Sequence, residues 1–317
     1  MRRILPIWTI IGLFLFTACG EDIDSPEEKP ETPEVSIVFA PLKSAADAAT
    51  DPDNLATEYA ILNLSIFLTD ASSNTVTDKF IHQSFTSLTD TSIMNCKLVT
   101  LPLDPATIPA KDIYVIANFD DTNSMSAVRT LDDLKALQTP AINSPNILTT
   151  ERGLPMYGET FNVDFTKTTD TPPSVMLIRT CAKIRVKLLF PDATWVGTDN
   201  KFAIENAPKY TYFVKNPNFT IPTTDLFDYP RIVFIENTPQ EYVNTTYVYE
   251  STSVPRLHLY TTIAGTAKEY LADSSFPLPV RNYLYDIEIQ ILKPLPASSA
   301  SKTGDAPNFR YKITVKN

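Results

Sequence analysis

Residues Val175–Phe190 read VMLIRTCAKIRVKLLF, a run with almost no turn-forming residues. In its second half, apolar and cationic residues alternate strictly. The apolar positions are Ala182, Ile184, Val186 and Leu188, and the cationic positions between them are Lys183, Arg185 and Lys187. A period of two with a charged outer face is typical of a long strand in a half-buried sheet. The polar, proline-containing spacer Thr166–Pro173 precedes it. We therefore expect this strand to lie where a first β-domain gives way to a second.

Further strands are predicted on both sides of this run. Those before it are Val35–Leu42, Tyr59–Thr69, Phe80–Phe85, Cys96–Leu101, Ile113–Phe119 and Thr160–Phe165. Those after it are Lys209–Val214, Arg231–Phe234, Tyr242–Tyr249, Arg256–Ile263, Phe276–Ile291 and Phe309–Val315. Many short strands separated by turn signals predict an all-β fold of two antiparallel β-sandwich domains, residues 35–173 and 174–317.

One short helix is predicted in the first domain. Thr130 is a suitable N-cap, and Asp133 follows three residues later, as in a capping box. Leu131, Leu134 and Leu137 share one face, and the helix is expected to end before Pro140.

Composition favours a folded, strand-rich protein and argues against a nucleic-acid partner. The 317 residues include 43% hydrophobic residues, enough for two ordinary cores. High proline (26) with low glycine (7) favours strands joined by rigid turns. The net charge of −10 argues against a nucleic-acid partner, which requires a basic face.

The N-terminus predicts export as a lipoprotein. Residues 1–18 have a basic start and an apolar stretch too short to span a bilayer, which is typical of a signal peptide. Leu15–Cys19 resembles a bacterial lipobox, so Cys19 is the expected lipidation site and the outer membrane the expected location. The alternative is an ordinary secretory signal with an incidental cysteine. Residues 19–34 form an acidic, proline-rich tether, which resembles the export signal of surface lipoproteins in the Bacteroidota.

No catalytic or cofactor motif stands out. His82 and His258 are the only histidines and fall in different predicted domains, so we expect no metal site, no cofactor and no enzyme activity. The acidic stretches Asp51–Asn54 and Asp120–Asn123 lack the spacing of a calcium loop and are expected to be solvated turns.

Two further groups of side chains leave alternatives open. After export Cys96 and Cys181 could form a disulfide, although two separate buried thiols are favoured. A tyrosine-rich region of the second domain is either core packing or, less favoured, a face that binds carbohydrate or protein. It comprises Tyr210, Tyr212, Phe213, Tyr229, Tyr242, Tyr247 and Tyr249.

Several stretches taken together resemble the major fimbrial subunit (fimbrillin) superfamily of Bacteroidales. They span almost the whole chain in a consistent order. They are the lipobox with Cys19, the strand Tyr59–Thr69, Tyr114–Asn118 with the helix Thr130–Leu137, Leu154–Glu159, Arg179–Val186 and Arg281–Ile287.

The resemblance implies two transthyretin-like sandwiches in a subunit of a cell-surface pilus whose partners are other fimbrial subunits. In that family a protease removes the tether and the first strand, which leaves an open groove in the N-terminal domain. A strand from another subunit then fills this groove. Here Val35–Leu42 would be the strand removed, and the groove would flank Tyr59–Thr69. The processing site of that family commonly uses arginine, and none lies between Arg3 and Arg129 here. Lys43 is the only basic residue in the loop after the first strand and is therefore the candidate processing site. A chain left uncut would suit an anchor subunit.

The last strand is the candidate donor or closing strand, through Phe309, Tyr311, Ile313 and Val315. The sequence ends at Asn317, soon after this strand, which favours a tip or accessory subunit over a stalk subunit. The alternative function is a monomeric surface lipoprotein that binds a glycan or a host protein.

Overall fold

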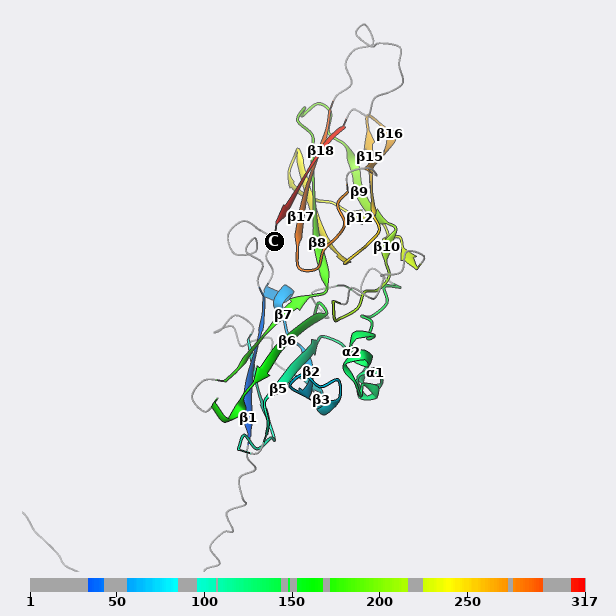
Figure 1. Cartoon of the computed structure of the whole chain (residues 1–317). Coiled ribbons are helices and arrows are strands. Elements are labelled where there is room, and N and C mark those ends of the chain that lie inside the picture. Colours follow the sequence, from blue (N-terminus) through cyan, green and yellow to red (C-terminus); the bar gives the residue numbers. More distant parts are fainter. Residues whose placement is uncertain are drawn as a thin grey trace, which may run out of the picture.

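The structure is a computed structural model that describes most of the chain after residue 33. The described residues are 34–42, 56–84, 96–106, 108–143, 148, 153–167, 172–215, 225–272, 276–292 and 309–316. Cys19, the tether before residue 34 and Lys43 lie outside them. The chain builds two β-sandwiches arranged end to end in an elongated molecule (Figure 1).

The first sandwich is one seven-stranded sheet that folds over itself. Its strands are β1 (Val35–Pro41), β2 (Asn63–Asp70), β3 (Val76–Ser84), β4 (Lys97–Leu101), β5 (Lys111–Ala117), β6 (Met156–Val163) and β7 (Ser174–Arg179). They lie in the order β3-β2-β5-β6-β7-β1-β4. Strand β7 joins the two layers, because its C-terminal end pairs with β6 and its N-terminal part pairs with β1.

The core of the first sandwich lies between these layers. It collects apolar side chains from alternate positions of six strands, including Ile37 and Phe39 of β1, Ile66 of β2, Val115 of β5 and Leu177 of β7. Alternate positions of a strand point to one face, so each strand contributes every second residue.

Two short helices, α1 (Thr122–Ala127) and α2 (Leu131–Lys135), cover the outer face of this sheet. The predicted helix is confirmed in α2: the Thr130 hydroxyl accepts from the Asp133 amide, and the Asp133 carboxylate accepts from the Thr130 amide. Helix α1 was missed. The stretch expected to be a solvated turn starts it, since the Asp121 side chain accepts from the Ser124 amide as an N-cap. Among the described residues there are also two 3₁₀ turns, η1 (Ala56–Tyr59) and η2 (Phe165–Lys167).

The second sandwich packs a five-stranded sheet against a four-stranded sheet. Its strands are β8 (Cys181–Leu189), β9 (Thr198–Glu205), β10 (Ala207–Pro208), β11 (Leu226–Phe227), β12 (Ile232–Val233), β13 (Ile235–Thr238), β14 (Glu241–Tyr249), β15 (Arg256–Ile263), β16 (Thr266–Ala272), β17 (Leu284–Ile291) and β18 (Phe309–Lys316). The sheets have the orders β13-β14-β8-β17-β18 and β12-β9-β15-β16, and β10 pairs with β11 separately.

The all-β, two-sandwich fold predicted from the sequence is confirmed. Two strand pairs are parallel rather than antiparallel, β1 with β7 and β8 with β17. Parallel neighbours need a long connection, and both pairs join strands that are far apart in the sequence.

The run Val175–Phe190 is two strands rather than one. Thr180 interrupts it, because its backbone amide and its hydroxyl both donate to the carbonyl of Pro155, at 2.9 and 3.1 Å. Strand β7 therefore belongs to the first sandwich and β8 to the second. The predicted domain boundary at residue 173 stays a proposal. The strand pairing described here would place that boundary at Thr180 instead.

Other predicted strands differ in extent. Lys209–Val214 is not a strand: Thr211 and Lys209 accept hydrogen bonds from residues 139 and 142, and an isolated bridge joins Tyr212 to Gln138. Tyr59–Thr69 begins as η1, and the strand within Phe276–Ile291 starts only at Leu284. Strands β9 and β16 were not predicted, because polar residues interrupt their apolar pattern.

Candidate functional site

Strand β1 is an inner strand of its layer. It pairs antiparallel with β4, from Val35 with Leu101 to Phe39 with Lys97, and parallel with β7, from Val38 with Ser174 to Pro41 with Leu177. At its C-terminal end the Leu42 amide donates to the Leu177 carbonyl at 2.7 Å. Without β1, the backbone groups of β4 and β7 that face it would be left unpaired.

The side chains of β1 alternate between the core and the outside. Val35, Ile37, Phe39 and Pro41 are buried, and the residues between them are half-buried. Ile37 and Phe39 are 0% exposed. Full burial of such side chains contributes about 1.5–3 kcal/mol each. Strand β1 thus contributes Val35, Ile37 and Phe39 to the first core.

The candidate groove differs from the one expected from the sequence. It would have β4 and β7 as its walls, not Tyr59–Thr69. Residues of that stretch, including Ile61, Leu64 and Ile66, lie across the core from β1 and would form its floor. The local pattern predicts which face of a strand is buried but not which strands pair with it.

Strand β18 is the edge strand of the second sandwich and pairs antiparallel with β17, from Phe309 with Ile291 to Lys316 with Leu284. Tyr311 and Ile313 are partly buried and pack against the second core. Val315 is 47% exposed. In this structure β18 therefore closes its own sheet. The side chain of Phe309 is not described.

A buried charge cluster joins the two sandwiches next to the groove. Glu58 of η1 is 0% exposed, and its carboxylate accepts from Lys183 Nζ at 2.6 Å and from Arg179 Nη1 at 3.1 Å. Burial, and next the Glu58 charge, raise the pKa of the Tyr247 hydroxyl well above its usual range. Lys183 was expected on a solvated face, but η1 covers it.

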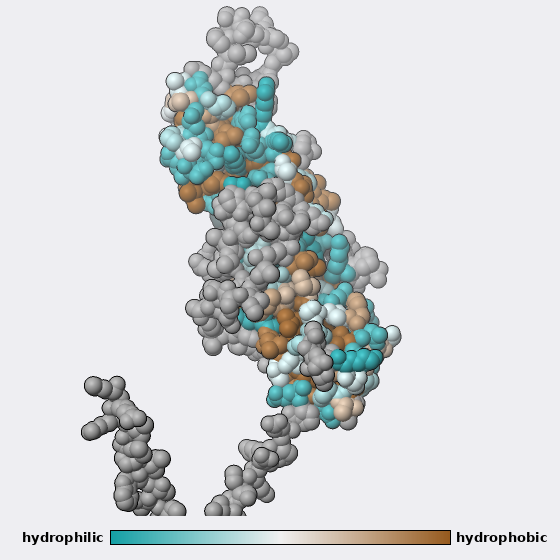
Figure 2. Space-filling view, turned by 90° about the vertical axis from the view of Figure 1, so that its left-hand side faces the viewer, coloured by the Kyte–Doolittle hydropathy of each residue, from teal (hydrophilic) through white to brown (hydrophobic). Residues whose placement is uncertain are grey.

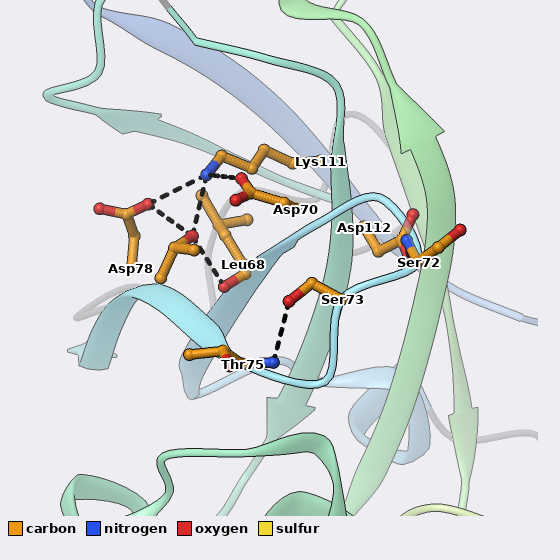
Figure 3. Close-up of polar contacts among 9 residues, drawn as sticks. Leu68, Asp70, Ser72, Ser73, Thr75, Asp78, Lys111 and Asp112 are labelled. Carbon is orange, nitrogen blue, oxygen red and sulfur yellow. Dashed lines mark hydrogen bonds and ion pairs between the residues drawn. The ribbon is translucent and has the colours of Figure 1, made fainter.

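A second polar cluster fastens the β2–β3 turn to β5 (Figure 3). The buried ammonium of Lys111 lies 2.7 Å from Asp70 Oδ1, 2.9 Å from Thr77 Oγ1 and 3.6 Å from Asp78 Oδ2. Both aspartates are partly exposed, so this cluster is a structural clamp with modest electrostatic strength.

A groove with a cavity volume of about 480 Å³ runs along the outer face of the first sandwich beside α2. Phe161 (57% exposed) and Met176 (44%) lie in its lining, and Lys135 and Lys215 contribute positive charge. Figure 2 shows one face of the molecule, on which several hydrophobic patches lie between hydrophilic areas.

The tyrosine-rich region is mainly core. Tyr229, Tyr247, Tyr249 and Phe213 are buried, while Tyr210, Tyr212 and Tyr242 are half-buried. This confirms the packing interpretation. Cys181 is a buried thiol, and no disulfide joins it to the half-buried Cys96. His258 lies in the second sandwich, with Nδ1 2.6 Å from Glu205 Oε1.

None of the helices in the described part of the chain has the length and apolar character of a membrane span.

Comparison with protein families gives one match. A family model described as "Major fimbrial subunit protein (FimA)" matches residues 34–199, just over half of the 317 residues. Among curated proteins, none matches the chain.

Solved structures share the fold at low sequence identity. The tip fimbrial protein Mfa3 from Porphyromonas gingivalis, in a form with a C-terminal truncation, has a TM-score of 0.56 and 15% identity, covering 90% of this chain and 100% of that one. A protein from Parabacteroides distasonis ATCC 8503, provisionally described as a cell adhesion protein, has a TM-score of 0.61 and 15% identity, covering 90% and 97%. A fimbrial assembly protein from the same strain has a TM-score of 0.54 and 15% identity, covering 89% and 98%.

Proposed function

The chain belongs to the family of major fimbrial subunit proteins (FimA) and is a structural subunit of a cell-surface fimbria; we propose that it is exported as a lipoprotein and joins its neighbours by exchange of β-strands. Lipidated Cys19 would hold the newly exported chain at the outer membrane. Its partners are other fimbrial subunits.

The observation that carries the proposal is the position of β1. It lies between two strands, places alternate side chains in the core, and ends two residues before Lys43, the candidate processing site. One cut there would leave β1 held only by noncovalent contacts. Its loss would expose two rows of backbone groups and a row of apolar pockets, which is the arrangement that binds an added strand.

Strand β18 is the candidate donor. It has eight residues against the seven of β1, and both place an apolar residue at every second position. In β18 these positions are Phe309, Tyr311, Ile313 and Val315. Because β18 lies at an edge, only one ladder of hydrogen bonds must break for it to leave its sheet. A chain that stays uncut would keep β1 and occupy the anchor position.

The first experiment is limited cleavage of the purified mature protein with a trypsin-like protease. We expect a cut after Lys43, release of the 19–43 fragment, and polymers in size-exclusion chromatography. Lys43→Gln should stay monomeric, whereas Lys167→Gln, which changes an exposed lysine elsewhere in the first sandwich, should behave like the wild type. A wild-type chain that is cut after Lys43 and remains a monomer would refute strand exchange by the cut form.

The same experiment separates the second candidate function, a monomeric surface lipoprotein that binds a glycan or host protein. The exposed Phe161 and Met176 in the groove beside α2 favour this candidate. It predicts a monomer with and without the cut.

A further inference from the structure

Glu58 ties together three parts of the molecule that are far apart in the sequence. It lies on η1, just before β2. Its two oxygens bind Arg179, the last residue of β7, and Lys183, in the second sandwich. Arg179 Nε also donates to Asn282 Oδ1 at 3.0 Å, next to the start of β17.

The cluster holds two parts of the candidate groove. One is β7, a wall of the groove, and the other is the segment that connects Glu58 to β2 on the groove floor. Strand β7, which ends at Arg179, is the parallel neighbour of β1. The segment after Glu58 leads through Ile61 into β2, which faces β1 across the core. The guanidinium of Arg179 also lies 5.2 Å from the centre of the Tyr59 ring. The cluster therefore fixes the distance between wall and floor at one end of the groove.

The burial of the cluster makes this connection rigid. The side chains of Glu58, Arg179 and Lys183 are 0%, 4% and 1% exposed. Separating a buried ion pair would leave each charge uncompensated in a medium of low polarity. The three side chains therefore resist being pulled apart. Asn118 holds the next residues, because its side chain donates to the Ala60 carbonyl and accepts from the Leu62 amide, both at 2.8 Å.

We infer that Glu58 is a positioning residue for strand exchange, which holds the groove in shape while β1 is absent. The inference rests on the proposed function. When β1 leaves, Ile61 and Leu64 lose part of the core cluster that they share with Ile37 and Phe39. A cut after Lys43 would also bring η1 close to a new chain end, where fraying is expected unless the segment is tied down. Glu58 supplies that tie through contacts that do not involve β1.

The test uses the full mature chain with a recognition sequence for a specific protease inserted within residues 44–55. After cleavage, a fluorescent synthetic peptide with the sequence of residues 34–42 is added, and its uptake in exchange for β1 is measured. The variant is Glu58→Gln, which keeps the shape of the side chain and removes its charge. The matched control is Asp132→Asn, which removes an exposed carboxylate paired with Lys135 at 3.6 Å.

We expect the cut Glu58→Gln chain to take up the peptide about tenfold less than the wild type, which corresponds to about 1.4 kcal/mol. The control should match the wild type. A residue with a merely structural role would lower the unfolding midpoint of the uncut chain and leave peptide uptake by the folded, cut chain unchanged. Equal uptake by folded Glu58→Gln and wild type would therefore overturn the inference.

The experiment also distinguishes a failure of strand exchange itself from a failure of the variant to fold. If the cut wild type takes up no peptide, the proposed strand exchange itself fails, and the inference fails with it. If uncut Glu58→Gln does not fold, Arg179→Met replaces it, because it removes the cation on the groove wall and keeps the pair between Glu58 and Lys183. Reduced uptake by that variant supports the inference, and wild-type uptake overturns it.

Discussion

Asn118 shows how one side chain organises the chain around the first core. It adopts a left-handed backbone conformation (φ 58°), donates to the carbonyls of Ala60 and Leu154, and accepts from the Leu62 amide. Gly153 lies against it, and a Cβ atom at Gly153 would come within 2.6 Å of Asn118 Cγ. Asparagine is among the few residues that tolerate this conformation, and a small neighbour leaves room for its amide.

Cys181 offers a prediction about pH and reactivity. Burial raises the pKa of its thiol to about 12, from an ordinary value of 9.0. Its contribution to stability is therefore fully present below pH 9.0 and is lost as the pH rises through about 12. Because the thiolate is the nucleophile, the folded protein should not be alkylated at Cys181 at about pH 8.

The measurement is mass spectrometry after treatment with iodoacetamide, on the variant Cys96→Ser. Cys181 should remain unmodified in the native protein and react fully in denaturant. Rapid modification of Cys181 in the native protein would show that β8 is open to solvent at its start, contrary to the structure.

At the scale of the element, the alternation of buried and half-buried residues along β1 makes a testable prediction. Ile37 is 0% exposed and points into the core, whereas its neighbour Val38 is half-buried on the outer face. Truncation of a buried isoleucine to alanine costs about 2–5 kcal/mol. We expect Ile37→Ala to lower the free energy of unfolding of the uncut chain by that amount, and the matched variant Val38→Ala to lower it by less than about 1 kcal/mol. Equal losses in equilibrium denaturation would contradict the assigned register of β1.

Strand position was predictable where β-branched and aromatic residues cluster between turn-forming segments. Strands β1, β14 and β15 were predicted within about one residue of their bounds. The N-cap at Thr130 and its partner Asp133 likewise predicted α2, because a capping box is a local signal.

The same pattern did not predict which strands pair with one another or which segments cover the outer face of a strand. Period two shows that Lys183 and Ile184 face opposite ways, but it does not distinguish water from a neighbouring segment as the cover of the Lys183 face. Here η1 supplies that cover together with the Glu58 carboxylate. The partners of β1 come from segments about 60 and 140 residues away, which no local window contains. The buried Glu58 of the candidate site was missed for the same reason.

At the scale of the whole molecule, the two candidate strands lie in different sandwiches. Strand β1 is in the first and β18 in the second (Figure 1). A strand of one subunit that fills the groove of the next makes a head-to-tail contact between unlike surfaces. Such contacts generate open filaments when the rotation does not close a ring. The arrangement therefore allows an open fibre, which a self-complementary two-fold contact would not.

The buried junction between the sandwiches suits a unit that transmits force along such a fibre. Besides the Glu58 cluster, Arg281 donates to the carbonyls of Tyr212 and Phe213, at 2.9 and 2.7 Å, and pairs with Glu250. Phe213 in turn packs 5.0 Å from Phe119, on the outer face of the first sandwich. These contacts couple the two halves of the chain.

The most direct test of the central claim is to determine the N-terminus of the chain in fimbriae sheared from the cell surface. The account predicts that the chain is present in the fibre fraction and starts at Ser44, with β1 gone and its place taken by a strand of a neighbouring subunit. A chain that starts at Cys19 but purifies with the fibres would occupy the uncut anchor position. A chain that starts at Cys19 and is absent from the fibres, recovered only as a membrane-bound monomer, would contradict the account.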